Sequence, residues 1–407
     1  MRKVAYLTDV EGRWDKLLDF CASSGPGGSL VTYDEARGLR VADDAVFVFG
    51  GDAIDRGPAG RKIVATLLAA KRAQPDRVVL LAGNRDINKL RLARELDVHP
   101  ASGTRGELLR AIFSKTMGAR DAFEHRLTEL TTDGQPASDD AVVDSWLEDV
   151  APDGVQTRYL AAAQLAHRED ETLFLHGGVT AENLGVVPGI APRLAGVDTW
   201  VRALNDFYAA SLNAFVARRC APDGTPRWRD LLAYQAPLPG TAFNQASVVY
   251  ARPGDALGNP MLPPEPVIDA LRASSVRRVV IGHTPSGDCP AVLRDRTGFE
   301  LVLADNSYGR LEHGSRVTIE AGLLRIEGTT LLDSGEREPV RCELPPDGAS
   351  SPLVGLRDAA TGRLVKARLG RGDYLLFRAL EGRRVEQVAA TEAELQRATL
   401  VLARPPR

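Results

Sequence analysis

Six side chains that could bind metal ions follow short apolar runs at five places in the chain. They are Asp9, Glu11, Asp52, Asn84, His176 and His283. Such runs are typical of buried strands, and the loops after the carboxyl ends of strands are where α/β proteins place their chemistry. Two divalent ions about 3.5–4 Å apart need roughly this many ligands, with one carboxylate bridging them. The residue types therefore predict a dinuclear metal site at the carboxyl edge of a sheet.

The stretch 50–57, which reads Gly-Gly-Asp-Ala-Ile-Asp-Arg-Gly, is the strongest single signal. It follows the apolar run 45–49, and its first two glycines let the backbone turn sharply. Asp52 is the first acid after that run, so we predict that it bridges the two ions. Asp55 and Arg56 follow in the same loop, which adds a second carboxylate and a guanidinium to the predicted site.

Five motifs, taken in chain order, resemble the calcineurin-like metallophosphoesterase superfamily. They read Asp-x-Glu, Gly-Asp-x-x-Asp-Arg-Gly, Gly-Asn-Arg-Asp, His-Gly-Gly and Gly-His-Thr-Pro. The resemblance covers about residues 3–99 and 171–310 and is closest to the branch of the serine/threonine phosphoprotein phosphatases and bacterial diadenosine tetraphosphatase. Pro285 favours this branch because it stands where other branches have a further histidine ligand. The resemblance implies an α/β fold, a four-layer α-β-β-α sandwich.

The resemblance also implies roles for individual residues. One ion would bind Asp9, Glu11 and Asp52, and the other would bind Asp52, Asn84, His176 and His283. The predicted catalytic residues are Arg85, Asp55 and Asp86, and the predicted phosphate-binding residues are Arg56, Arg85 and Arg252. A water between the two ions would attack phosphorus in line with the leaving group.

The first departure from the family pattern is Glu11, where relatives typically have a histidine. A carboxylate makes the first metal site all-oxygen, which suits a hard cation. We therefore expect two divalent metal ions, in the first place Mn²⁺, with Mg²⁺, iron and Zn²⁺ as alternatives. The other possibility is that Glu11 faces solvent and water completes the coordination.

The second departure is Arg85, where relatives have the histidine that protonates the leaving group. Arginine stays protonated in proteins and cannot act as a general acid, but it can neutralise charge on the leaving oxygen. Arg85 therefore favours substrates whose leaving group is already stable as an anion. Two alternatives stay open: the domain binds phosphate without turnover, or His99 or His125 supplies the proton.

Arg252 follows the apolar run 247–250, which predicts a strand that ends in a phosphate-binding arginine. An ordinary surface charge is the alternative. Tyr308 follows a later predicted strand and could donate a hydrogen bond to a substrate oxygen or simply pack in a turn.

The chain divides into a discontinuous core (1–98 and 171–345), a helical cap insertion (99–170) and a C-terminal β-rich appendage (346–407). The insertion lacks strand patterns, and we expect it to shape substrate access; a passive stabilising role is the alternative. The appendage shows no catalytic constellation. It could bind a partner or substrate, or cover a sheet edge.

The whole chain of 407 residues is 44% hydrophobic and 26% charged, with a net charge of −3. This composition is globular and gives no field that would attract nucleic acid or an anionic membrane. Its four cysteines are widely spaced, and the sequence shows neither a signal-peptide pattern nor an apolar run of transmembrane length, so we expect a cytoplasmic protein.

These observations predict a metal-dependent phosphoesterase that hydrolyses a phosphate monoester or anhydride of a small molecule or nucleotide. A serine/threonine-type protein phosphatase and a catalytically impaired phosphate-binding module are the alternatives. No protein partner can be named from the sequence.

Overall fold

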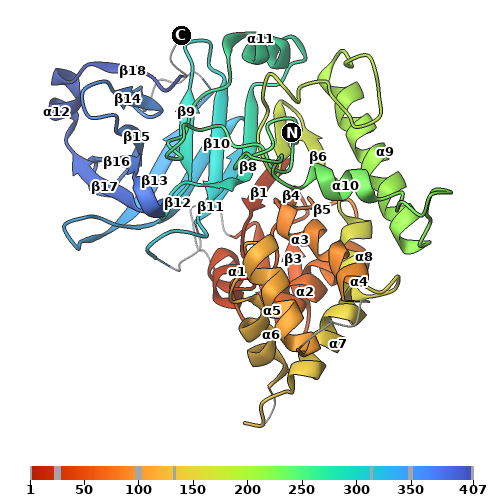
Figure 1. Cartoon of the computed structure of the whole chain (residues 1–407). Helices are drawn as coiled ribbons and strands as arrows, with labels where there is room; N and C mark the ends of the chain where they lie inside the picture. The colour runs from red at the N-terminus through yellow and green to blue at the C-terminus, as the bar shows by residue number, and fades with distance from the viewer. Residues whose placement is uncertain are drawn as a thin grey trace.

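The computed structural model describes residues 2–22, 29–96, 103–131, 134–311, 315–346 and 352–404 (Figure 1). Its first sheet has the order β13-β12-β11-β1-β4-β5, in which β1, β4 and β5 are parallel. These strands are β1 (Lys3–Leu7), β4 (Ala45–Phe49), β5 (Val78–Leu80), β11 (Arg316–Glu320), β12 (Leu323–Leu331) and β13 (Arg337–Leu344). The β4 bounds are those of the apolar run in the sequence.

The second sheet has the order β6-β7-β8-β10-β9, with β7, β8 and β10 parallel. Its strands are β6 (Ala166–Glu169), β7 (Thr172–Leu175), β8 (Arg278–Pro285), β9 (Ala291–Arg294) and β10 (Glu300–Asp305). Every residue of β4, β7 and β10 is buried, as expected for strands covered on both faces.

The two sheets pack face to face, and helices cover their outer faces. Tyr6 of β1 stacks on Phe174 of β7 with ring centroids 5.7 Å apart, whereas Phe47 of β4 meets Phe20 of α1 (Trp14–Cys21) at 5.5 Å. Successive side chains of a strand point to opposite faces, so one set fills the space between the sheets and the other packs on helices. The α-β-β-α sandwich is therefore confirmed.

The remaining helices of the sandwich flank the two sheets and follow the site loops. They are α2 (Gly60–Ala73), α3 (Asn84–Asn88), the 3₁₀ turn η1 (Lys89–Arg91), α4 (Leu92–Glu95), α9 (Val197–Val216), α10 (Arg229–Tyr234) and α11 (Glu265–Ala273). A hairpin of β2 (Val31–Asp34) and β3 (Gly38–Val41), which the sequence patterns did not predict, extends the N-terminal half. Among the described residues, no helix combines the length and apolar character needed to cross a bilayer.

The predicted insertion contains α5 (Arg105–Thr116), α6 (Ala122–Leu130), α7 (Asp139–Asp149) and α8 (Val155–Ala162). These helices pack beside α2, where Arg61 Nε lies 3.0 Å from Asp149 Oδ1. The sheet resumes before the predicted boundary at residue 170, because β6 is already an edge strand of the second sheet.

The C-terminal region forms its own antiparallel sheet of order β17-β16-β15-β14-β18, seen in blue in Figure 1. Its strands are β14 (Leu356–Asp358), β15 (Leu364–Arg368), β16 (Tyr374–Ala379), β17 (Val385–Ala390) and β18 (Leu400–Leu402). One helix, α12 (Glu392–Arg397), precedes β18.

Candidate metal centre

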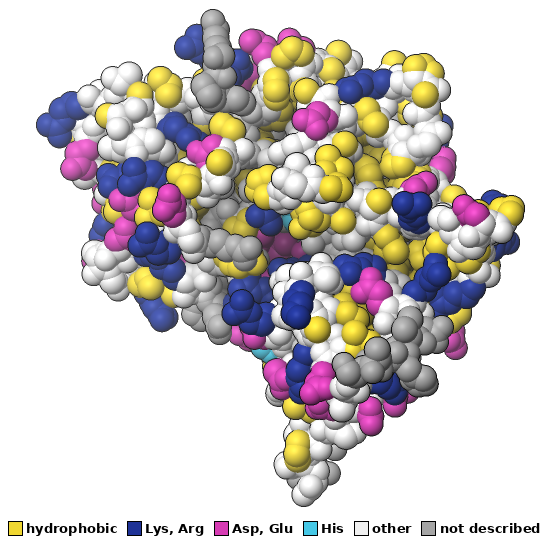
Figure 2. Space-filling model, in the orientation of Figure 1, with side chains coloured by type: hydrophobic (Ala, Val, Ile, Leu, Met, Phe, Trp, Pro, Cys, Tyr) yellow, Lys and Arg dark blue, Asp and Glu magenta, His cyan; other side chains and the backbone are white. Residues whose placement is uncertain are grey.

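The six predicted metal ligands lie together and are all buried, with at most 8% of each side chain exposed. They come from the loops after β1, β4 and β5, the loop after β7, and the end of β8, which meet where the two sheets converge. The front of the molecule is hollowed near its centre, and basic, acidic and histidine side chains gather at the bottom of this hollow (Figure 2). The sequence therefore predicted correctly which residues the fold brings together.

Two overlapping groups of ligand atoms fit two ions. The candidate donor atoms of Asp9, Glu11 and Asp52 all lie within 4.8 Å of one another, as do those of Asp52, His176 and His283. Asp52 belongs to both groups, which is the position that a bridging carboxylate requires.

The backbone of the site adopts conformations that L-residues rarely use. Asp9, Glu11, Asp52, Asp55 and His283 all have φ between 48° and 114°. Such strain costs roughly 1–3 kcal/mol per residue and clusters at functional sites, where the surrounding structure holds it. The strained residues here turn their side chains from the strand ends into one centre.

Gly83 lets the loop after β5 approach the bridging carboxylate. A Cβ at this position would lie 2.1 Å from Asp52 Oδ1 and 2.4 Å from the Asp52 nitrogen. Only glycine fits this contact, so the Gly-Asn-Arg-Asp motif needs its first residue for steric reasons.

Asp86 holds the loops in place from behind the site. Its carboxylate accepts hydrogen bonds from the backbone N–H groups of Asp52 at 2.8 Å, Ala53 at 2.9 Å and Gly83 at 2.9 Å. Burial and the neighbouring Asp52 raise the pKa of Asp86 to about 7, against the effect of these N–H donors. Both its oxygens are thus engaged with backbone, which is the geometry of a positioning residue.

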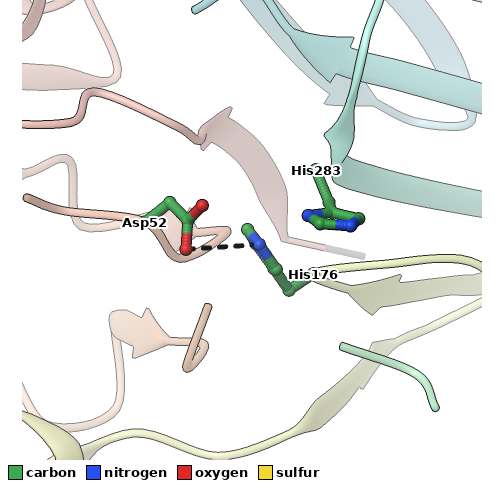
Figure 3. Close-up of side chains that lie close together, drawn as sticks. All are labelled: Asp52, His176 and His283. Atoms are coloured by element: carbon green, nitrogen blue, oxygen red, sulfur yellow. Dashed lines mark ion pairs between the residues drawn. The ribbon is translucent and has the colours of Figure 1, made fainter. Parts of the chain in front are cut away.

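His176 is oriented by the backbone and faces two ligands (Figure 3). Its Nδ1 lies 2.8 Å from the Gly50 carbonyl, while Nε2 lies 3.2 Å from Asn84 Oδ1 and 3.3 Å from Asp52 Oδ1. Burial alone would lower the pKa of His176, but the Asp52 carboxylate outweighs it and raises the pKa to about 10. A carbonyl on one ring nitrogen leaves the other to bind a metal.

His283 supplies the clearest sign that an ion belongs here. Its Nε2 is buried and has no hydrogen-bond partner among the described residues, and Figure 3 shows the ring beside His176. Burial, and next the charge of Arg252, hold the pKa of His283 well below its usual range, so the imidazole is neutral. A buried neutral imidazole whose Nε2 lies beside the Asp52 carboxylate and His176 fits a divalent cation, since buried polar atoms otherwise find partners.

Glu11 and Arg85, the two departures from the family pattern, contact each other. Arg85 Nε lies 2.6 Å from Glu11 Oε1 and 3.5 Å from Asp52 Oδ2, and Arg85 Nη1 lies 3.4 Å from Asp55 Oδ2. Burial raises the pKa of Glu11 to about 7, although Arg85 and Arg56 both act to lower it. Glu11 is 2% exposed, so the alternative that it faces solvent is wrong.

Arg56 and Tyr308 form the rim of the site. The Arg56 guanidinium carbon lies 3.9 Å from the centre of the Tyr308 ring, and Arg56 Nη1 donates to the Ser307 carbonyl at 2.9 Å. Tyr308 Oη is in turn 3.5 Å from Arg85 Nη2. Tyr308 thus contacts both guanidinium groups that face the site.

Lys89 is a site residue that the sequence patterns did not reveal. It is fully buried, and its Nζ donates to Asp55 Oδ2 at 2.7 Å. Its position four residues after Arg85 is the one available signal, because residues i and i+4 share a helix face. Both cations therefore reach the same Asp55 carboxylate oxygen.

Arg252 does not end a strand, because residues 247–250 form a turn instead. The Ser247 hydroxyl accepts hydrogen bonds from the N–H groups of Val249 and Tyr250, which closes that turn. Arg252 nevertheless lies beside the site, and its buried Nε has no hydrogen-bond partner among the described residues.

His99 and His125 are the two alternative proton donors suggested by the sequence. His99 lies outside the described residues. His125 lies on α6 near enough for the charges of Asp55 and Arg56 to act on it, and burial lowers its pKa. The insertion reaches the site itself at Gly118, whose carbonyl is 3.4 Å from Arg85 Nη1.

Comparisons with known proteins place this geometry in a family. The chain is 18% identical to a cold-active protein-tyrosine phosphatase of the psychrophile Shewanella sp., with a TM-score of 0.42, 83% of this chain and 80% of that chain covered. For a protein serine/threonine phosphatase from Saccharomyces cerevisiae with similarity to human phosphatase PP5, the identity is 12%, the TM-score 0.39, and the coverage 79% and 73%. For a metallophosphoesterase from Sphaerobacter thermophilus, the identity is 12%, the TM-score is 0.28, and 78% of this chain and 83% of that chain are covered. The comparison with curated proteins gives no match.

The family model of calcineurin-like phosphoesterases matches residues 2–287, which contain all six candidate ligands. This match covers well over half of the chain and includes the five sequence motifs whose residues form the candidate metal centre. The chain therefore belongs to the calcineurin-like phosphoesterase family and is a hydrolase that acts on phosphate ester bonds.

Proposed function

We propose that this protein hydrolyses a phosphate monoester or anhydride of a small molecule or nucleotide with the help of two divalent ions. The observation that carries the proposal is the partnerless His283 Nε2 beside two groups of ligand atoms that share Asp52. Asp9, Glu11 and Asp52 would hold one ion, and Asp52, Asn84, His176 and His283 the other. The predominance of carboxylate and amide oxygens favours Mn²⁺ over softer ions.

Bound ions would lower the pKa of an attacking water and neutralise charge on the phosphoryl oxygens. The residues of the chain would position the substrate. Arg56 and Arg85 present planar guanidinium groups to the same hollow, and such groups bind phosphate oxygens through paired hydrogen bonds. Glu11, Asp55 and Tyr308 contact the Arg85 guanidinium and fix its position beside Asp52.

Arg85 sets the leaving-group requirement. Hydrolysis forms a bond from the water oxygen to phosphorus and breaks the bond to the leaving oxygen, which departs with the electron pair. Arg85 cannot donate a proton to that oxygen, but it can stabilise its charge. Without a general acid, a poor leaving group reacts about 10²–10⁴-fold more slowly. We therefore place anhydrides and activated esters ahead of simple alkyl phosphates.

A substrate panel tests this proposal. The purified protein should hydrolyse p-nitrophenyl phosphate and nucleoside polyphosphates faster than glycerol phosphate, compared side by side with Mn²⁺, Mg²⁺, Zn²⁺ and Fe²⁺. A preference for phosphoserine peptides over every small molecule would support a protein phosphatase instead. Phosphate binding without turnover of any substrate would show a catalytically impaired module.

A further inference from the structure

A cavity of about 290 Å³ opens directly beside the metal centre. It begins at Thr284 and Pro285, which follow the ligand His283, and at Tyr308, which contacts both Arg56 and Arg85. This volume is close to the lower end of the range for small-molecule sites, about 300–1,000 Å³. A compact molecule that places its phosphoryl group on the metal centre would extend its other end into this cavity.

The far wall of the cavity comes from the C-terminal sheet. Phe377 and Ala379 of β16, with Arg384 and Val385 at the start of β17, line it. Residues of the segment 242–258 also line the cavity. Among the described residues, the helical insertion contributes no lining side chain. The C-terminal region, rather than the predicted cap, therefore bounds this approach to the centre.

Buried hydrogen bonds fasten this wall to the loops of the site. Gln387 Nε2 of β17 donates to Asp288 Oδ2 at 2.6 Å, and the same oxygen accepts from the Leu331 N–H at 2.8 Å. Lys366 of β15 is fully buried and donates to the Ser286 carbonyl. Both acceptors, Ser286 and Asp288, lie within five residues of His283, so the wall has a fixed position relative to the metal centre.

The charge of the cavity is suited to an anion. Arg252 and Arg384 both line the cavity; the buried Nε of Arg252 has no hydrogen-bond partner among the described residues, and Arg384 is exposed. Asp255 is the acid among the lining residues, and its Oδ1 already accepts from the N–H groups of Leu257 and Asn259 at 2.9 Å. Arg384 Nε donates to the Glu381 carbonyl at 3.3 Å, so the terminal nitrogens of Arg384 and the Nε of Arg252 are the donors that a ligand can use.

Four aromatic side chains also line the cavity. Phe243, Tyr250, Tyr308 and Phe377 all face the cavity. Tyr250 also packs on the ligand His283 with ring centroids 4.8 Å apart, which ties the cavity to the metal centre. Aromatic side chains bind planar rings by stacking, and each stacked ring contributes about 1–3 kcal/mol.

We propose that this cavity binds the leaving group of the substrate, and that this leaving group carries a planar ring and a second anionic group, as in a nucleoside phosphate. The inference rests on the proposed function, because the phosphoryl group to be cleaved must lie at the metal centre. Arg384 and Arg252 bind the second anionic group, and the aromatic walls enclose the ring.

Kinetics with ADP, pyrophosphate and p-nitrophenyl phosphate test the assignment. With Mn²⁺, kcat/KM for ADP should exceed that for pyrophosphate about tenfold or more, because only ADP carries the ring. Arg384→Gln should raise the KM for ADP about tenfold with little change in kcat, and Arg384→Glu about a hundredfold. The ratio of kcat/KM for ADP to that for p-nitrophenyl phosphate should fall by the same factors.

Arg397→Gln and Arg397→Glu are the matched controls, since Arg397 is on α12 of the same region but does not line the cavity. Neither should change that ratio. Turnover of p-nitrophenyl phosphate with no preference for ADP over pyrophosphate, or with a ratio that Arg384→Glu leaves unchanged, would overturn the cavity assignment while the proposed function stands.

Calorimetric binding of AMP in EDTA separates the two proposals. AMP is the leaving group of ADP, so it should bind without turnover, and Arg384→Gln should weaken its binding about tenfold. If no substrate turns over but AMP binds in this way, the proposed function fails and the cavity assignment holds. If AMP does not bind at millimolar concentration, the cavity assignment is wrong.

Discussion

Arg85 Nε lies 2.6 Å from Glu11 Oε1, so the two residues that depart from the family pattern form one buried ion pair. A carboxylate in place of the family's first-motif histidine adds a negative charge to the site, and an arginine in place of the third-motif histidine adds a fixed positive charge. The positive charge of Arg85 compensates the negative charge of Glu11 at contact distance. The two departures are therefore one coupled alteration of the site.

A double-mutant cycle between Glu11 and Arg85 measures this coupling. Glu11→His and Arg85→His should each lower kcat/KM for p-nitrophenyl phosphate about 10²-fold, because each leaves a buried charge without its partner. The fold-loss of kcat/KM in the double variant should be at least about ten times smaller than the product of the two single fold-losses. This difference corresponds to a coupling free energy of roughly 1.4 kcal/mol or more. Losses that simply add would contradict the coupling.

The electrostatic role of Arg85 is tested by varying the leaving group. Arg85→Ala should lower kcat/KM by about 10²–10³-fold on anhydrides, because it removes the charge that faces the leaving oxygen. In the Glu11→His variant, adding Arg85→His should raise kcat/KM most for alkyl phosphates, because a histidine can donate a proton to the leaving group and an arginine cannot. If Arg85→Ala leaves every rate unchanged, the residue has no role in the reaction.

Gly83→Ala should remove activity without unfolding the protein. The added Cβ would lie 2.1 Å from Asp52 Oδ1 and must displace the bridging carboxylate. We expect turnover to fall at least about 10²-fold, as for a misplaced catalytic group, while circular dichroism shows a folded chain. Gly134→Ala is the control: a Cβ there meets nothing within 4 Å, and the backbone strain that its φ of +74° adds lies in the loop between α6 and α7. Equal activity of the two variants would contradict the steric account.

Lys89→Met should destabilise the fold by about 3 kcal/mol, because it leaves the buried Asp55 with Arg85 at 3.4 Å as its one ion-pair partner among the described residues. Urea unfolding measures the change. The same substitution at Lys115, which is exposed on α5, should stay within about 0.5 kcal/mol. A loss as small at Lys89 as at Lys115 would show that the buried pair does not support the site.

Glu169 gives a pH-dependent contribution to stability away from the metal centre. A hydrogen bond with His167, and then Arg2, lowers the pKa of Glu169 to about 2. The unfolded state binds the proton more readily, so the contribution is complete above the ordinary pKa of about 4.3 and is lost as pH falls toward 2. Glu169→Gln should cost about 1 kcal/mol at pH 6, a value discounted for the exposure of Arg2, and less at pH 3. Equal costs at both pH values in urea unfolding would contradict this origin.

The sequence predicted several of the core strands, and which candidate ligands lie together, for a physical reason. Short buried strands such as β4 are continuous apolar runs bounded by glycine, which makes them recognisable without any neighbour. Parallel strands share a direction, so the polar residues after β1, β4 and β5 had to meet at one edge. Asp9, Glu11, Asp52 and Asn84 follow from these two facts, and His176 and His283 meet in the same way at the ends of the parallel strands β7 and β8 of the second sheet.

Features set by tertiary contacts could not be read from the sequence. Lys89 is buried because the insertion places Phe113 and Trp146 near its Nζ, at 5.7 Å and 5.9 Å. The run 247–250 has the composition of a strand but forms a turn. The Ser247 hydroxyl accepts a hydrogen bond from the Val249 N–H, and the Val248 carbonyl accepts one from the Gly177 N–H. These packing and hydrogen-bond partners are distant in the sequence, so the local pattern of residues does not predict them.

Restoring metal to EDTA-treated protein tests the central claim most directly. The initial rate of p-nitrophenyl phosphate hydrolysis is measured as Mn²⁺ is added to the wild type and to Asp52→Asn. The account predicts a rate that rises from background and saturates for the wild type, and a rate that stays at least about 10³-fold lower for Asp52→Asn. A metal-independent rate, or full activity of Asp52→Asn, would contradict a phosphoesterase built on two ions that share Asp52.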